Sequence, residues 1–327
     1  MASAAAVRGS ISAVRAHEFF VDKAGEPMCL ASDLVLGRRL DVSRRLEEMV
    51  LYALTEAVEP VWSDGLRTRA RCLLGLPEPR VGMPPEVYKS LAAFVTRRLG
   101  LANGAVQSIP GGHAAGLMAI QIAAGRISRG EVDVYLIAGV DSYYSPETLE
   151  SLDEQGLLMS AVNRNGYPPG EAAGACILVS RSAAERYGLP ILARIGSAAT
   201  GIEPYPIYSK QVCVGTGLTA VLRSVTGGLR LPDEAVTATY CDLNGQRYRN
   251  EEYVYTLLRV QGAFVDVHDY KSPADCWGDV GAASGPLFAC LAIAAMQRRY
   301  AQGAFPMLWA GSESGYRSAV LLKLGDV

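Results

Sequence analysis

The sequence has few of the residues on which metal and redox sites depend. Only three histidines occur in 327 residues, and no two cysteines are spaced as Cys-x-x-Cys. Zinc and redox sites need such clusters, so we expect no metal ion and no cofactor. The cysteines are odd in number and mostly stand in apolar runs, which favours buried free thiols in a reducing compartment. They are Cys29, Cys72, Cys176, Cys213, Cys241, Cys276 and Cys290.

Basic tracts are also lacking. The formal net charge is −2, and arginines come in isolated pairs, as at 38–39, 44–45, 97–98 and 298–299. Such pairs are typical of solvated helix faces, whereas a nucleic-acid-binding surface needs a basic stripe or patch. We expect no nucleic-acid partner.

Long apolar runs are missing as well. Arg8 and Arg15 near the N-terminus are not joined by the apolar core of a signal peptide. The most apolar helical stretches are too short, and too interrupted by glycine, to cross a bilayer. The sequence therefore predicts a cytoplasmic protein with no membrane insertion.

What the sequence does contain is enough apolar residues for a large core: half of its residues are hydrophobic and a fifth are charged. The most informative stretch spans 111–126 and reads GGHAAGLMAIQIAAGR. A helix without a polar face must be buried on all sides. His113 stands at its N-terminus, where unpaired N–H groups favour negative charge.

A similar passage returns at 281–296, reading GAASGPLFACLAIAAM. The intervals Gly112–Gly116 and Gly281–Gly285 have the same spacing, and each opens an apolar helix. Both buried helices begin with small residues at the same spacing. This repetition predicts two related halves that face each other. Tyr187–Pro190 marks the seam, which gives an N-terminal half at 1–188 and a C-terminal half at 189–327.

Periodicity and capping signals predict the remaining elements. Residues 1–10 are expected to be frayed, and 196–211 to be irregular. Helices are predicted at 43–58 (with Ser43 as N-cap), 85–99, 216–229, 253–260 and 281–300. Strands are predicted at 10–21, 28–30, 70–76, 106–109, 132–139, 175–179, 191–195, 235–241, 263–267, 307–310 and 318–324.

Several segments, in order, resemble the thiolase superfamily and most nearly its β-ketoacyl synthases. The run from His113 to Asp141 resembles the nucleophile helix and the strand that follows it, and 169–174 (PGEAAG) resembles a Pro-Gly-Glu turn of that family. Asn244, Lys271 and the stretch 278–285 (GDVGAASG) fall where the family carries further motifs, and 314–319 where it places a gating loop. The resemblance implies that Gly112, Glu171, Lys271, Gly278, Ser314 and Gly315 are binding or pocket residues. For Glu171 and Lys271, loop hydrogen bonds and an ion pair are the simpler interpretation.

The resemblance implies an α/β fold of duplicated βα halves, layered α-β-α-β-α around two central buried helices. It also implies a homodimer. The chain is shorter than a full synthase, which trimmed loops around the substrate tunnel would explain.

The departures from the family pattern concern chemistry. The family carries a nucleophilic Cys at the position of His113, and His, or His and Asn, at those of Asn244 and Asp279. Condensation needs a thiolate, whose pKa a helix N-terminus lowers. An acyl-imidazole hydrolyses instead of waiting for a second substrate. The substitutions therefore predict that condensation is lost.

Three roles remain open for His113. In the first, it is a neutral imidazole that is hydrogen-bonded to backbone and whose pKa the helix N-terminus lowers. In the second, it is a base that activates water and is oriented by Asp279. In the third, it is part of a pocket that binds an acyl group without catalysis. Asp279 equally suits an N-cap for the helix after Gly281. Arg247 and Arg249 flank Asn244 and suit either a phosphate site or the surface.

These alternatives give three functional hypotheses. The favoured one is a non-condensing protein that binds a partner, as a subunit or as an adaptor or chaperone; chain-length factors, and thiolase-like proteins encoded beside type VI secretion effectors, are precedents. The second is an acyltransferase or thioester hydrolase that uses His113 with Asp279. The third is an active 3-oxoacyl-ACP synthase with an unrecognised nucleophile, although Cys213, Cys241 and Cys276 suit structural roles better. The expected protein partner is a carrier protein, a synthase subunit or a secretion effector.

Overall fold

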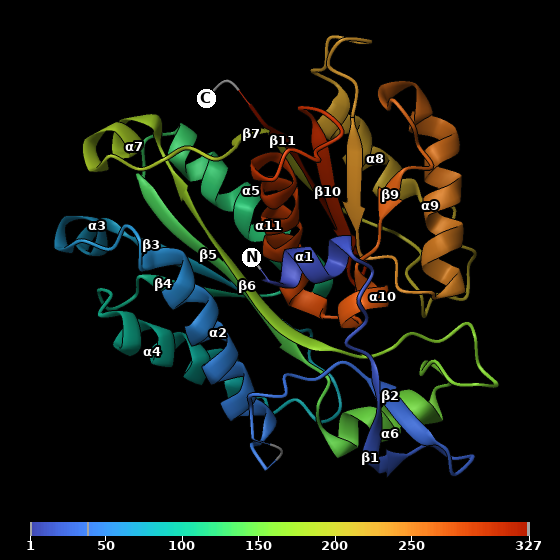
Figure 1. Ribbon diagram of the computed structural model, residues 1–327. Helices are drawn as coiled ribbons and strands as arrows, with labels where there is room; N and C mark the ends of the chain where they lie inside the picture. The colour runs from blue at the N-terminus through green and yellow to red at the C-terminus, as the bar shows by residue number, and fades with distance from the viewer. Residues whose placement is uncertain (1, 38, 326–327) are drawn as a thin grey trace.

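The computed structural model describes residues 2–37 and 39–325 (Figure 1). Its first sheet has the strand order β4-β3-β5-β6. Strand β3 (Arg71–Leu76) is parallel to both β4 (Val106–Pro110) and β5 (Val134–Ser142). Strand β6 (Glu171–Val179) runs antiparallel to β5 and ends the sheet.

The second sheet has the order β7-β11-β10-β8-β9. It comprises β7 (Arg194–Ile202), β8 (Ala238–Cys241), β9 (Tyr270–Lys271), β10 (Pro306–Gly311) and β11 (Tyr316–Lys323). Strand β8 is parallel to β9 and β10, whereas β11 is antiparallel to both β10 and β7. The strands of the first sheet precede residue 188 and those of the second follow it. The boundary at 188/189 stays a prediction.

Helices complete five layers in the predicted order α-β-α-β-α (Figure 1). On the outer face of the first sheet lie α2 (Val42–Val58) and α4 (Val87–Leu99), with a core of their own. On the outer face of the second lie α8 (Thr216–Thr226) and α9 (Arg247–Val260). Between the sheets lie α5 (Ala115–Ser128) and α11 (Ser284–Gln297), and a third core joins them to both sheets.

The two central helices meet at glycine. A Cβ on Gly116 of α5 would lie 2.4 Å from Pro286 Cδ of α11, and one on Gly285 would lie 2.6 Å from Leu117 N. Each helix follows a short 3-10 turn, η1 (Gly112–Ala114) or η3 (Gly281–Ala283). The first glycine of each turn has a positive φ, which a residue with a side chain adopts only at a cost. The shared glycine spacing therefore lets two buried helices approach and lets the chain turn into each of them.

Smaller elements surround this frame. They are α1 (Ala2–Arg8), the antiparallel pair β1 (Arg15–Val21) and β2 (Pro27–Leu30), α3 (Asp64–Arg69), α6 (Pro146–Glu154), α7 (Arg181–Tyr187), η2 (Gln261–Ala263) and α10 (Ala274–Trp277). No helix in the part of the chain that the structure describes is both long and apolar enough to span a membrane.

Several predicted elements were wrong. Residues 2–8 are helical rather than frayed, and β7 continues to Ile202 through residues predicted to be irregular. The strand predicted at 263–267 is a 3-10 turn followed by a single bridge between Phe264 and Val236. The N-cap of α2 is Asp41, whose side chain accepts from Arg44 N–H. The cysteines are free as expected, but Cys290 is exposed.

Candidate functional site

His113 and Asp279 meet between the two halves. Residue 113 lies in η1, and Asp279 lies between α10 and η3. Nε2 of His113 is 2.7 Å from Oδ1 of Asp279 and 2.9 Å from Oδ2. Both residues are buried, at 5% and 4% exposure. The predicted partnership of these two side chains is therefore present, and the predicted backbone partner of His113 is replaced by a carboxylate.

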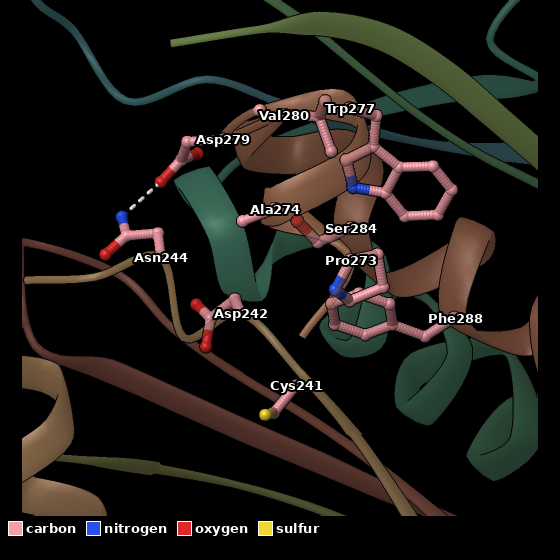
Figure 2. Close-up of a pocket in the computed structure, with 11 residues that line it drawn as sticks. Cys241, Asp242, Asn244, Pro273, Ala274, Trp277, Asp279, Val280, Ser284 and Phe288 are labelled. Atoms are coloured by element: carbon pink, nitrogen blue, oxygen red, sulfur yellow. Dashed lines mark hydrogen bonds between the residues drawn. The ribbon is translucent and has the colours of Figure 1, made fainter. Parts of the chain in front are cut away.

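The carboxylate of Asp279 accepts from two further donors. Asn244, in the loop after β8, donates from Nδ2 to Oδ2 at 2.5 Å (Figure 2). The N–H of Gly281 donates to Oδ1 at 2.9 Å. The predicted N-cap role of Asp279 was wrong, because Val280 occupies the N-cap position of η3 and Ala283 that of α11. Because a buried carboxylate must be hydrogen-bonded, these contacts fix both its position and its charge.

A second ion pair, absent from the sequence predictions, lies against the first. Arg249 of α9 donates from Nη1 to Oδ2 of Asp242 at 2.9 Å and to the carbonyl of Gly311 at 2.6 Å. Its Nη2 is 3.4 Å from His113 Nε2. Arg249 is thus buried inside the site, whereas Arg247 is exposed and pairs with Glu251. Asp242 could have been indicated as a site residue from the sequence, because it stands directly after a parallel strand, where polar side chains gather.

Charge pairing sets the protonation of the site. Burial lowers the pKa of His113, but the charge and hydrogen bond of Asp279 outweigh burial and the repulsion from Arg249, so its pKa is raised above 6.5. The expectation of a lowered pKa was wrong because it omitted this carboxylate. Burial raises the pKa of Asp279, but His113, Arg249 and Asn244 together bring it well below its usual value. While it is protonated, an imidazole held in this way is neither a nucleophile nor a base.

Side chains of β5 and of the residue after β10 bind N–H groups of η1 and η3, the turns that lead into the two central helices. Ser312, just after β10, accepts from the N–H of Ala114 at 3.0 Å and donates to the carbonyl of Gly111. Asp141 of β5 accepts from the N–H of Ala282 at 3.1 Å and pairs with Arg80. Each half thus supplies a hydrogen-bond acceptor to the turn of the other half, and these two N–H groups are satisfied by protein.

A cavity of about 10 Å³ lies beside Asp242, Asn244 and Asp279 (Figure 2). This volume is close to the minimum for one water molecule. Two buried polar atoms nearby, Oδ1 of Asp242 and Nε2 of Gln246, have no hydrogen-bond partner. The cavity fits a bridging water better than an acyl chain.

The comparisons with known proteins agree with this architecture. Residues 75–184 match the family model described as "Beta-ketoacyl synthase, N-terminal domain". Comparison with curated protein sequences gives no match. The module 6 ketosynthase of the bacillaene synthase of Bacillus subtilis 168 superposes with a TM-score of 0.80 at 14% identity, over 99% of this chain and 69% of that one. The fold is the thiolase-like fold of the ketosynthases.

Other ketosynthases superpose similarly. The ishigamide ketosynthase/chain length factor gives a TM-score of 0.80 at 15% identity, with 99% of this chain and 94% of that one covered. A β-ketoacyl synthase from Burkholderia phymatum STM815 gives 0.76 at 16% identity, with 98% and 94% covered. The chain spans 58% of the length of a mutant form of the bacillaene ketosynthase.

Within this ketosynthase-like fold, two residues expected at the pocket have other partners. Glu171 forms a buried, two-point ion pair with Arg45 and accepts from Ser142 Oγ at 2.7 Å. Lys271 is half-buried on β9 and donates to Gln302 at 2.8 Å. The simpler interpretation of both residues, loop hydrogen bonds and an ion pair, agrees with these contacts.

The glycines and Ser314 shape the backbone around the site. Gly112 has a φ of +56°, and a Cβ there would lie 2.8 Å from Glu78 Cγ. Gly278 has a φ of +73°, and a Cβ there would lie 2.8 Å from Pro169 O. Gly315 has φ +106°. Ser314 is exposed and contributes its N–H to Glu78 at 3.2 Å. These four residues act through backbone geometry.

The cysteines nearest in sequence to the site do not resemble activated nucleophiles. Cys241 and Cys276 are buried, and burial raises the pKa of each thiol. Among the described residues, Glu203, Cys213 and Glu252 come close enough together to hold a metal. Their carboxylates already accept from Gly217 N–H and from Arg317, both at 2.7 Å. That group fits an internal hydrogen-bond network.

Proposed function

We propose that this chain is a non-condensing ketosynthase-like protein that acts by binding a protein partner, as a subunit or an adaptor. The observation that carries the proposal is the buried contact between His113 and Asp279, at 2.7 Å, where the resemblance expects a cysteine. Condensation requires an attacking thiolate that holds the acyl group. A charge-paired imidazole, with a second ion pair against it, supplies no such group.

The printed descriptions of two structural neighbours support a protein partner. One is a ketosynthase/chain length factor, and another is a type II ketosynthase in complex with its acyl-carrier protein. By analogy, the partner proposed here is a carrier protein or a synthase subunit, and the chain itself forms a homodimer. An adaptor for a secretion effector fits the same non-condensing role.

Thioester hydrolysis is the second candidate, because His113 and Asp279 do form the Asp–His pair that a general base needs. Against this candidate stand the raised pKa of His113 and the burial of both residues. Burial limits the access of water and substrate to the imidazole, and a raised pKa increases the share of His113 that is protonated and cannot accept a proton.

Turnover of acyl-CoA and acyl-carrier thioesters distinguishes these candidates. We expect no hydrolysis above background, and the same rate for the native protein and for His113→Gln. His268→Gln is the matched control, since that histidine is exposed and outside the site. Hydrolysis that His113→Gln abolishes and His268→Gln retains would establish the second candidate and overturn the proposal.

Binding is tested separately by calorimetry with holo-acyl-carrier protein. We expect the native protein and His113→Gln to bind it equally, because the proposed role does not use the imidazole. If neither binds the carrier, a carrier protein is excluded as the partner.

A further inference from the structure

A short segment after β3 crosses the junction between the halves, next to the candidate site. It comprises residues 77–80, which read PEPR, and is called the strap below. Its two prolines restrict the backbone, so the strap has little conformational freedom to lose when a side chain on it is held in place.

Arg80 anchors one end of the strap to the first half. Its Nη2 donates to Oδ1 of Asp141 at 2.6 Å and to the carbonyl of Ser142 at 2.7 Å. The guanidinium carbon also lies 4.1 Å from the centre of the Tyr143 ring. Because Asp141, Ser142 and Tyr143 are all buried, this end of the strap is fixed to the core of its own half.

Glu78 reaches from the strap to the second half. Its Oε2 accepts from the N–H of Glu313 at 3.1 Å, and its Oε1 accepts from the N–H of Ser314 at 3.2 Å. Both N–H groups belong to the turn 312–315 between β10 and β11, called the β10–β11 turn below. Successive backbone N–H groups in a turn form a concave site for an anion. The carboxylate of Glu78 is therefore an anion, supplied by the chain itself, in such a site.

The same side chain lies against the turn η1, which carries His113. A Cβ on Gly112 would lie 2.8 Å from Cγ of Glu78 and 3.0 Å from its Oε2. Ser312, which begins the β10–β11 turn, accepts from the N–H of Ala114 on the other side of His113. The strap and the β10–β11 turn thus meet at η1, and Glu78 joins them there.

The bonds of Glu78 are far more accessible to water than the ion pair of the site. Glu78 is half-buried and Ser314 is exposed, whereas His113 and Asp279 are only 5% and 4% exposed. Water can replace partly exposed hydrogen bonds at a small net cost, but a buried ion pair separates only at a large one. Segments held by exposed backbone hydrogen bonds are those that open locally. The β10–β11 turn therefore opens more easily than the site beneath it.

We propose that Glu78 is a latch: its bonds to the β10–β11 turn close the candidate site, and their release lets solvent reach His113. The structure holds the closed state. In the open state, water replaces the carboxylate on the N–H groups of Glu313 and Ser314, and the strap stays anchored through Arg80. The latch governs access to the site, so it is independent of whether His113 has any chemistry.

Backbone hydrogen exchange of the native protein and of Glu78→Gln tests the latch. Glutamine keeps the size of the side chain but has no charge and only one acceptor oxygen. We expect the N–H groups of Glu313 and Ser314 to exchange about tenfold faster in Glu78→Gln, because charge-assisted hydrogen bonds are lost. Glu86→Gln is the matched control, since Glu86 is exposed just before α4 and its side chain makes no capping hydrogen bond. It should leave both exchange rates unchanged.

Deuterium uptake at the C2 carbon of imidazole reports whether solvent reaches His113. In Glu78→Gln, uptake at His113 should rise toward that of the exposed His268. Uptake at His268 should be the same in all three proteins, which makes it an internal standard.

The latch would be overturned in any of three ways. Unchanged exchange at Glu313 and Ser314 would mean that Glu78 does not hold the turn. Faster exchange there without faster uptake at His113 would mean that the turn opens without exposing the site. An equal acceleration of the buried amides of β5 would mean that Glu78 supports the whole fold and not a local closure.

Discussion

At the scale of single residues, the site is defined by which side chains share Asp279. The imidazole of His113 contacts the carboxylate of Asp279 from the other half. That carboxylate also accepts hydrogen bonds from Asn244 Nδ2 and from the N–H of Gly281. Arg249 and Asp242 add a second pair. The site is therefore a buried charge network across the junction of the halves.

Removal of one member of this network should be costly. We expect Asp279→Asn to lower the free energy of unfolding by about 3–5 kcal/mol, because it leaves a buried charge without its partner. Urea denaturation measures the change. Asp269→Asn is the control: that carboxylate is partly exposed and 3.4 Å from Lys271, and it should cost less than about 1 kcal/mol. Equal losses from both variants would mean that the His113–Asp279 pair is not an important source of stability.

The pH dependence of stability follows from the pKa directions. Because the pKa of His113 is raised above 6.5 in the folded state, its contribution is complete below pH 6.5 and is lost as pH rises through the raised value. The contribution of Asp279, whose pKa is lowered from 3.8, is present above that value and is lost only as pH falls through the lowered one. The stability advantage of the native protein over His113→Gln should therefore shrink as pH rises from 6.5 through the raised pKa of His113. Urea unfolding across this range checks it, and an advantage that grows with pH would contradict the assignment.

At the scale of elements, the repeated glycine spacing was the strongest signal in the sequence. It predicted both central helices and their mutual contact, because a helix without a polar face has to be buried and glycine permits close approach. Short elements such as α1 and α7 escaped prediction because seven residues give too little periodicity. The second part of β7, GSAATGI, is too rich in small residues to indicate a strand, and its pairing with β11 determines it.

The residues of the candidate site, like the elements of the fold, could be predicted only in part from the sequence. The glycine-framed turn before the first central helix indicated His113, whereas Asn244 and Asp279 were indicated by the resemblance to the β-ketoacyl synthases. Arg249 and Ser312 could not be assigned from sequence, because their roles depend on how α9 and the end of β10 pack against the other half.

The contact between the central helices is testable through two glycines of α5. We expect Gly116→Ala to lower the free energy of unfolding by about 1–3 kcal/mol, because its Cβ would lie 2.4 Å from Pro286 Cδ. Gly125→Ala in the same helix meets only the flexible end of Arg129, at 3.4 Å, and should stabilise by about 0.5–1 kcal/mol. Thermal or urea unfolding compares them. If Gly116→Ala were as well tolerated as Gly125→Ala, the two helices would not pack as described.

At the scale of the whole molecule, five layers have the thiolase-like arrangement, while the junction between the halves holds ion pairs. Sequence identity with the solved ketosynthases is only 14–16%, so the fold is shared far more clearly than any chemistry. Function must therefore be judged from the side chains at the junction. The ion pairs between those side chains are the basis of the proposal that this protein binds a partner and does not condense acyl groups.

The most direct test of this account is the intact mass of the protein after incubation with acyl-CoA and acyl-carrier thioesters. Because His113 is held by Asp279 and no activated thiol stands beside it, we predict that the mass stays unchanged. An acyl adduct on His113, or on a cysteine such as Cys241, would show a working nucleophile in this fold and would contradict the account.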